Sequence, residues 1–547
     1  MIDAVLLSSL AKVFPQYDLP MDCKKTKGSM LKNEAYSFQV AYRYSGDSMM
    51  NLPVYVEVDS DLGDALTYRM VETVPCDFPM YPNNPGVGLV VQEEGLVHPE
   101  SPVFPDVLRP GNKPLWILHN QWRSLWFTID GTKKALKPGV HKIKITITDG
   151  CGRTPVTFTI DIKDKKLPKQ TLICTNWFHC DGLCQYYNVE FASERFWEIC
   201  ESFVQKAADY GINMILMPLF TPPLDTVPNQ ERLTTQLVGV TKKGKKYTFD
   251  FTLVKRWIAM CKKCGVEYYE MSHMFTQWGA KHAPKVMATV DGKYQRIFGW
   301  ETDSHGEEYK DFLKQFIAAL IPVLKEEKIA KKCYFHTSDE PGADMLEGYS
   351  ECASFLRDLV KGFKTFDALS DINIYKTGCI ECPVPGIDHM DEFLKADIKE
   401  RWTYYCCGQI NKVSNRFLCF PSVRQRILGM QLWKYDIKGF LQWGYNFYNS
   451  QGSERPVDPY NTTTGGGWVP GGDCFIVYPN YDGTALPSIR MEVMRECHQD
   501  MRALQALEKK IGREEVEKLV GKKLSFTNYS LDPNKLIKIR EKVNELL

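Results

Sequence analysis

The first part of the chain alternates apolar and polar side chains with the period of β-strands. Val, Ile or Phe occupies every second position in three stretches: 54–58, 143–147 and 156–162. Period two gives each strand one buried and one wet face, as in antiparallel sheets. Pro138-Gly139 is typical of a turn between two such strands. We therefore predict an N-terminal antiparallel β-sandwich over residues 1–165, followed by a charged linker at 163–169.

From residue 170 the pattern changes to short apolar strands that alternate with amphipathic helices. The predicted strands cover 171–174, 213–220, 266–275, 333–337, 401–406 and 439–445. The predicted helices cover 193–210, 253–263, 307–331, 423–435 and 488–507, with an inserted hairpin at 231–251. Ser193 and Gly211 are typical first and last caps of the first helix. Repeated strand–helix units, about eight in number, favour an α/β fold with a (β/α)8 TIM-like barrel. We predict this catalytic barrel over 170–520 and a C-terminal helical tail over 521–547.

Charge and composition argue against several classes of protein to which the chain could belong. The 547 residues carry 68 Lys and Arg against 67 Asp and Glu, a net charge of +1. This balance argues against nucleic-acid or membrane partners that bind through bulk charge. The chain lacks the ~18–20 apolar residues of a membrane-spanning helix. Asp3 stands where a signal peptide carries a basic residue, and the 18 Cys are scattered, so we predict a cytoplasmic protein of undetermined oligomeric state.

Several predicted strands end in polar or aromatic side chains that a buried strand does not usually contain. In a parallel barrel, the active site lies at these carboxyl ends. The resulting candidates for substrate binding are His179, Asp181, His273, Trp278, Tyr404, Trp443, Tyr445 and Asn446. Flat aromatic rings stack on sugars, although core packing explains any single ring equally well. A structural histidine is likewise an alternative for His179 and His273.

The strand at 333–337 ends in two adjacent carboxylates, Asp339 and Glu340, which precede Pro341. Neighbouring strand residues face opposite sides, so both acids can serve one site only if the chain bends there. Two clustered carboxyls do not easily ionise together, and one pKa rises. We expect Glu340 to hold the proton and Asp339 to stay ionised. A solvated pair that caps the next helix is the alternative interpretation.

Adjacent acids on one strand also constrain the reaction. Glycosidases ordinarily use two carboxyls about 5–5.5 Å apart for retention or about 6.5–9.5 Å apart for inversion, placed on opposite sides of the bond. An adjacent pair instead favours substrate assistance, in which the substrate's 2-acetamido oxygen attacks C1. In that mechanism Glu340 protonates the leaving oxygen, while Asp339 holds the acetamido N–H.

Three segments resemble one enzyme family. They are 337–341 (TSDEP), 439–446 (GFLQWGYN) with Gly472-Asp473 and 477–479 after it, and 487–492 (PSIRME). In these segments the chain resembles the family 123 glycoside hydrolases, which are N-acetyl-β-galactosaminidases. The resemblance implies that Glu340 is the general acid/base and Asp339 the acetamido-orienting residue. It implies a sugar pocket lined by Trp443, Tyr445 and Asn446, with Asp473 as a further substrate-binding candidate. The stretch 495–498 departs from the family in a helix that we interpret as structural.

Other motifs do not indicate a metal ion or cofactor, and we expect neither. Strand alternation separates His336 from the two acids, and the pair Cys261 and Cys264 lies in a predicted helix without a second pair. The glycines at 465–467 lack the lysine of a phosphate-binding loop. We interpret Cys406-Cys407 as ordinary buried thiols rather than a redox pair.

The sequence as a whole predicts a soluble glycosidase. It would remove β-linked N-acetylgalactosamine from a glycan or oligosaccharide with retention, through an oxazolinium intermediate. The alternatives are another β-hexosaminidase, a two-carboxylate glycosidase, or a non-catalytic carbohydrate-binding barrel protein. The N-terminal domain is either a carbohydrate-binding module or a packing partner of the barrel.

Overall fold

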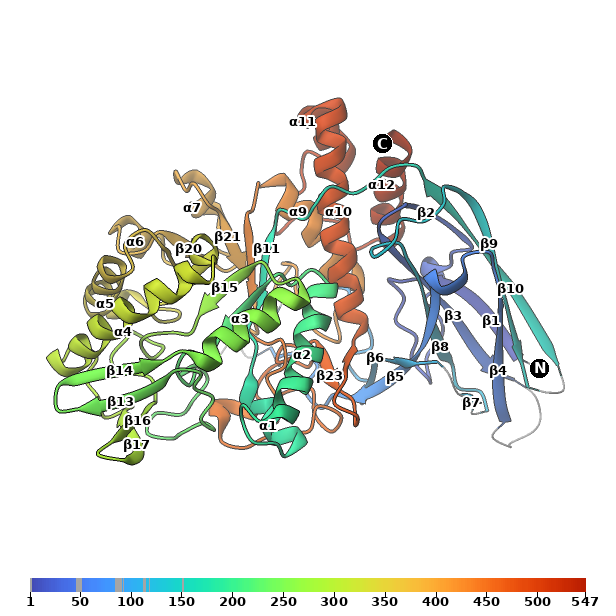
Figure 1. Cartoon of the computed structure of the whole chain (residues 1–547). Coiled ribbons are helices and arrows are strands. Elements are labelled where there is room, and N and C mark those ends of the chain that lie inside the picture. The colour runs from blue at the N-terminus through green and yellow to red at the C-terminus, as the bar shows by residue number, and fades with distance from the viewer. Residues whose placement is uncertain are drawn as a thin grey trace.

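The N-terminal third of the protein consists of two five-stranded sheets, and the remainder is built around an eight-stranded parallel sheet (Figure 1). The computed structural model describes residues 2–45, 52–83, 91, 93–111, 115–117, 119–149 and 152–547. In Figure 1 the long helix α10 (Ile489–Ile511) stands between the two parts.

The first N-terminal sheet is antiparallel throughout. Its strands, in spatial order, are β1 (Ile2–Ser8), β3 (Ala35–Tyr44), β8 (Arg123–Asp130), β5 (Leu66–Pro75) and β6 (Val103–Pro110). The second sheet contains β2 (Lys27–Leu31), β10 (Arg153–Lys163), β9 (Gly139–Thr148), β4 (Leu52–Asp59) and β7 (Leu115–Ile117), with only β2 and β10 parallel. The three stretches with period two are therefore confirmed as strands β4, β9 and β10.

Side chains of both N-terminal sheets meet in one hydrophobic cluster. Phe38 of β3 stacks on Phe158 of β10 with ring centroids 4.0 Å apart. Ile143, Ile145 and Ile147 of β9 are fully buried, as their alternation predicts.

The eight-stranded sheet forms a nearly closed parallel barrel. Its strands, in spatial order, are β20 (Cys382–Val384), β19 (Lys364–Ala368), β18 (Cys333–Phe335), β15 (Tyr268–Met271), β12 (Met214–Met217), β11 (Ile173–Asn176), β22 (Gly439–Gln442) and β21 (Trp402–Tyr404). The Tyr404 amide donates to the Pro385 carbonyl at 3.0 Å, and the Ile387 amide donates to the Tyr404 carbonyl at 2.9 Å. These two bonds link the ends of the sheet beside β20 and β21.

Helices alternate with the barrel strands and continue after them. They are α1 (Cys180–Tyr187), α2 (Glu194–Asp209), α3 (Thr252–Cys264), α4 (Glu307–Glu326), α5 (Leu346–Leu359), α6 (Ile372–Lys376), α7 (Met390–Lys395), α8 (Ser422–Arg426), α9 (Leu428–Lys434), α10, α11 (Arg513–Val520) and α12 (Pro533–Leu546). Ser193 caps α2 by accepting from the Phe196 amide at 3.2 Å, as predicted. The helix predicted to reach residue 331 stops at Glu326, because Lys328 adopts the left-handed conformation that ends a helix. Within the described residues, no helix is both long and apolar enough to cross a bilayer.

Two small sheets complete the fold. The predicted hairpin at 231–251 is present as β13 (Gly239–Lys243) and β14 (Lys246–Asp250). It joins an unpredicted second hairpin, β16 (Val286–Val290) and β17 (Lys293–Phe298), in one four-stranded sheet. The strands β23 (Val477–Pro479) and β24 (Ala485–Pro487) pair just before α10.

Helix α10 connects the barrel to the N-terminal sheets. Its apolar side chains pack against β5, β6 and β8. Arg490 forms a buried ion pair with Asp106 of β6 at 2.7 Å, and Glu492 forms one with Arg69 of β5 at 2.5 Å. Although burial opposes ionisation, the charges of Arg495 and Arg69 lower the pKa of Glu492 to about 2. The 487–492 segment therefore anchors the first sheet to the barrel.

Candidate active site

A cavity of about 170 Å³ opens where the barrel strands end. Its lining comes from segments at the ends of most of the barrel strands and from one later loop. The lining residues are Trp177, Asp225, Gln277, Trp278, Asp339, Glu340, Ala368, Tyr404, Cys406, Cys407, Leu441, Trp443 and Trp468. A concave site lined by aromatic rings and a few polar groups is typical of small-ligand binding.

The chain bends at the end of β18 and brings both adjacent acids to this cavity. Glu340 has a φ of 42°, a conformation that non-glycine residues rarely adopt. Its amide donates to the Ala368 carbonyl at 2.9 Å, while the Asp339 carbonyl accepts from the Trp278 amide at 3.2 Å. Both side chains consequently line one space. Strained backbone held this firmly is common at functional sites.

The electrostatics of the pair differ from our expectation. Burial raises the pKa of Asp339 well above its usual range, and the negative charges of Glu340 and Asp225 raise it further. This shift favours the protonated form of Asp339, which we had expected to stay ionised. Tyr404 donates its hydroxyl to Glu340 Oε1 at 2.5 Å.

Asp225 is a third carboxyl in the cavity, and the sequence analysis did not select it. It lies in the loop after β12 with a φ of 49°. Its amide donates to Gln277 Oε1 at 2.7 Å, and its carbonyl accepts from the Ser453 hydroxyl at 2.6 Å. Within the part of the chain that the structure describes, no group donates a hydrogen bond to its carboxylate. Burial, with the charges of Glu340 and Asp473, raises the pKa of Asp225 to about 7.

Three of the predicted aromatic residues line the cavity. Trp278 is 49% exposed, and its φ of 60° directs it away from a regular strand. Trp443 is 8% exposed and donates its indole N–H to Asp473 Oδ2 at 2.7 Å. Trp468, which we had not selected, lies with its ring centroid 5.8 Å from that of Trp443. Together with Tyr404 these rings can support a sugar face.

His179, Asp181 and Asn446 do not line the cavity but hold its wall from behind. Arg232 donates to both Asp181 oxygens at 2.7 and 2.8 Å and to His179 Nδ1 at 3.2 Å. His179 Nε2 lies 2.9 Å from the Trp443 carbonyl, which places the imidazole proton on Nε2. Asn446 bonds both the amide and the carbonyl of His179, at 2.9 and 3.0 Å. Burial and the charge of Arg232 lower the pKa of His179 to about 4, so this ring is neutral.

Tyr445 and Asp473 also lie outside the lining. The Tyr445 side chain is fully buried and donates to the Phe203 carbonyl of α2 at 2.8 Å. Asp473 accepts the indole N–H of Trp443 and also a hydrogen bond from Gln442 Nε2 at 3.1 Å. Burial raises the pKa of Asp473 to about 6 against the opposing charge of Arg416. These positions give both residues supporting roles behind the cavity.

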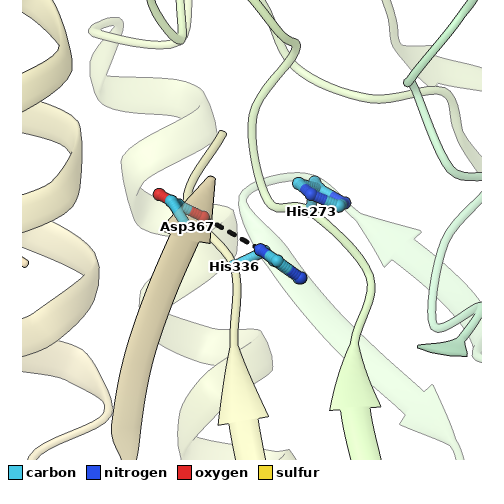
Figure 2. A group of neighbouring side chains, drawn as sticks. All are labelled: His273, His336 and Asp367. Atoms are coloured by element: carbon cyan, nitrogen blue, oxygen red, sulfur yellow. Dashed lines mark hydrogen bonds and ion pairs between the residues drawn. The ribbon is translucent and has the colours of Figure 1, made fainter. Parts of the chain in front are cut away.

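A fully buried ion-pair network lies in the barrel interior, next to the two acids. His336 Nδ1 lies 3.0 Å from Asp367 Oδ1 (Figure 2). Its Nε2 lies 2.5 Å from Glu270 Oε1. Asp367 also accepts the amides of Thr337 at 3.0 Å and Ser338 at 3.2 Å, immediately before Asp339. Burial alone would lower the pKa of His336, but the two carboxylates raise it to about 9. The imidazolium thus holds the turn that carries the acids.

His273 lies against this network without joining it. Figure 2 shows its ring beside that of His336, and the two rings stack with centroids 3.9 Å apart at 16°. Neither His273 nitrogen has a partner within the described residues. Donor atoms of His273, His336 and Asp367 lie within 4.8 Å of one another. However, both His336 nitrogens already bond carboxylates, and the in-plane lone pairs of stacked rings do not converge on one ion. We therefore interpret the group as an ion-pair network.

The vicinal cysteines differ from our expectation. Cys406 and Cys407 follow β21 and line the cavity, and both are partly exposed rather than buried. The strand ends before them, so no sheet neighbour covers their side chains.

Sequence reasoning missed Asp225, Glu270 and Asp367. Glu270 and Asp367 are charged residues inside apolar strands, which is a usable signal because an unpaired buried charge is costly. Asp225 sits in an irregular loop, where no periodicity marks it.

Comparison with known proteins adds a family match. Residues 177–507 match the family model "Glycoside hydrolase 123, catalytic domain". A family 123 glycoside hydrolase from Clostridium perfringens, studied for glycolipid glycan hydrolysis, superposes with a TM-score of 0.74 at 14% identity. That match covers 100% of this chain and 97% of the other, and it shows a shared fold. β-Glucuronidase 3 of Bacteroides uniformis matches 86% of this chain and 50% of its own, with 10% identity and a TM-score of only 0.30. No curated protein matches the sequence.

Proposed function

Because the chain belongs to the family 123 glycoside hydrolases, we propose that it hydrolyses β-linked N-acetylgalactosamine in glycans with retention of configuration. Family membership makes it a glycoside hydrolase, and the matched residues, 177–507, make up more than half of the chain. The finer assignment depends on one observation above all: Asp339 and Glu340 line the same cavity.

The arrangement of the acids supports substrate assistance. The two acids are consecutive, so they cannot easily lie on opposite faces of a glycosidic bond, as two-carboxylate mechanisms require. In the proposed reaction the 2-acetamido oxygen attacks C1 and forms an oxazolinium ion. Asp339 accepts the acetamido N–H, and Glu340 protonates the leaving oxygen. Glu340 then removes a proton from the water that opens the oxazolinium ring.

Substrate binding would also redistribute the proton of the pair. The raised pKa of Asp339 favours a proton on that residue. A hydrogen bond from the acetamido N–H favours the ionised form of Asp339, so the pKa of this residue falls on binding. The proton is then available to Glu340, whose Oε1 is occupied by Tyr404 and whose other oxygen is left to act as the acid.

A thiazoline that mimics the oxazolinium ion should inhibit strongly. Because it resembles the reacting species, we expect it to bind at least about 100-fold more tightly than an aryl N-acetyl-β-galactosaminide. Asp339→Asn should weaken this inhibition, since the amide cannot supply the carboxylate charge. The measurement is the inhibition constant for both forms, alongside turnover of aryl β-glycosides of GalNAc, GlcNAc, Gal and Glc.

Turnover of the four aryl glycosides can also contradict the proposed function. Efficient turnover of the plain β-galactoside without thiazoline inhibition would exclude substrate assistance. Equal turnover of GlcNAc and GalNAc substrates would indicate a broader β-hexosaminidase. Tight sugar binding with no turnover of any member would indicate a non-catalytic barrel protein.

The position of Asp225 also allows a second mechanism, that of a two-carboxylate glycosidase. Asp225 reaches the cavity from the loop after β12, a different strand from the one that carries the two adjacent acids, as the second acid of such an enzyme would. We favour instead a role in binding sugar hydroxyls, because its carboxylate accepts no hydrogen bond within the described residues and is available to do so.

Asp225→Asn separates these roles. If Asp225 binds hydroxyls, kcat/KM should fall about 10- to 100-fold, the worth of one charged hydrogen bond, and azide should not restore it. If it is the nucleophile, activity should be abolished and azide should rescue it by attacking the sugar in its place. Asp344→Asn, at an exposed position three residues beyond Pro341, is the matched control.

We further propose that the N-terminal sheets form a β-sandwich that packs on the barrel rather than binding sugar. The Arg490–Asp106 and Glu492–Arg69 ion pairs support this role. The division into residues 1–165, 170–520 and 521–547 stays our prediction.

A further inference from the structure

Two neighbouring thiols face the candidate active site. Cys406 and Cys407 line the same cavity as Glu340 and Tyr404. Both are partly exposed, whereas the fifteen other cysteines in the described part of the chain are buried. A thiol reagent that enters the cavity therefore meets these two sulfurs first.

Cys406 and Cys407 are consecutive in the chain and line the same cavity, so both thiols border one space. The Cys406 amide donates to Gln409 Oε1 at 2.8 Å, and the Cys406 carbonyl accepts from Asn415 Nδ2 at 2.8 Å. These two bonds fix the backbone that carries the pair at the cavity wall.

The geometry points to a covalent site: Cys406 and Cys407 form a vicinal dithiol that binds a trivalent arsenical across both sulfurs and thereby occupies the cavity. With phenylarsine oxide, two S–H bonds break and two As–S bonds form. The two protons leave with the oxide oxygen as one molecule of water. No electrons are transferred, so the step needs no oxidant or reductant.

Chelation gives this site its selectivity. Once one As–S bond forms, the second sulfur is already adjacent, and its effective concentration far exceeds that of a free thiol. A reagent that binds one sulfur lacks this advantage. It also meets a protonated thiol, because the neighbouring Cys407 thiol, desolvation at the cavity wall and the charge of Glu340 raise the pKa of Cys406.

A second pair of neighbouring cysteines, which is buried, serves as an internal control. Cys180 and Cys200 also lie near enough to influence each other, but they are only 3% and 0% exposed. Thiol proximity is common to both pairs, and access to the cavity belongs only to Cys406 and Cys407. The folded protein should therefore react at one pair and not at the other.

Titration with phenylarsine oxide, read by intact mass under non-reducing conditions, tests the site. The folded protein should take up one arsenical, which peptide mapping places on Cys406 and Cys407 and which excess dithiothreitol removes. Cys406→Ser and Cys407→Ser should each bind at least about tenfold more weakly, because the chelate is lost. Cys200→Ala, which alters only the buried pair, should bind like the wild type.

Three results would overturn the proposal: no adduct on the wild type, an adduct on other cysteines, or binding by either serine variant as tight as by the wild type. Mapping of the wild-type adduct keeps the test valid if a variant does not fold. Occupation of the cavity is tested separately, by inhibition of aryl glycoside hydrolysis, and this arm alone depends on the proposed function. An adduct that leaves an active enzyme uninhibited would show that the arsenical does not block the sugar site.

Discussion

Glu340→Gln should lower kcat by about 10²–10⁴-fold on substrates whose leaving group is a sugar or alkyl alcohol. Such leaving groups need a proton as the bond breaks, and Gln cannot supply one. On an aryl N-acetyl-β-galactosaminide with an acidic phenol, the loss should be much smaller. Steady-state kinetics on the two substrate classes measures the difference.

The hydrogen bond between Tyr404 and Glu340 makes Gln the informative substitution at position 340. Tyr404 bonds one oxygen of Glu340 at 2.5 Å, so Gln can keep that contact through its own oxygen and lose only the acid. Glu347→Gln, at an exposed position in α5, is the matched control and should retain activity on both substrates. Equal losses on both classes for Glu340→Gln would contradict the acid role.

His336→Gln should destabilise the fold by about 3–5 kcal/mol, because it leaves two buried carboxylates without their cation. Glu270 and Asp367 flank His336 at 2.5 and 3.0 Å, and all three side chains are fully buried. Chemical denaturation at pH 6.5 measures the loss. Activity should fall as well, since Asp367 holds the amides of Thr337 and Ser338 just before the two acids.

The same variant should change how stability depends on pH. The pKa of His336 is about 9 in the folded protein, against 6.5 ordinarily. The charge therefore stabilises the fold fully below pH 6.5, and this contribution is lost as the pH rises through 9. Between these values the gap between wild type and variant should narrow by about 3 kcal/mol.

Two controls isolate the network. His389→Gln makes the same change at an exposed histidine paired with Asp388 and should be nearly neutral. Tyr349→Phe removes one hydrogen bond to Asp367 and should cost about 1 kcal/mol. If His336→Gln loses no more than Tyr349→Phe, the imidazolium does not carry the structural role assigned to it.

Prediction of the fold from the sequence succeeded where local pattern was strong. The alternation in β9 and β10 and the Ser193 cap each depend on a few consecutive residues. The strands β19 and β20 were missed, because β19 (KTFDA) contains two charged residues and β20 (CPV) a proline, so neither forms the uninterrupted apolar run of a buried strand. Helix 423–435 was predicted as one element but is divided into α8 and α9 at Ile427.

By itself the sequence determined the alternation of strands and helices, and it placed Asp339 and Glu340 at a strand end, because both depend on neighbours along the chain. Only the tertiary structure decided that Asp225 and two thiols share their cavity, and that His179 and Asn446 stand behind it. It also decided that burial and clustered negative charge raise the pKa of Asp339. The physical reason is that desolvation and Coulomb interactions depend on distance in space, and the strands that supply these groups are far apart in sequence.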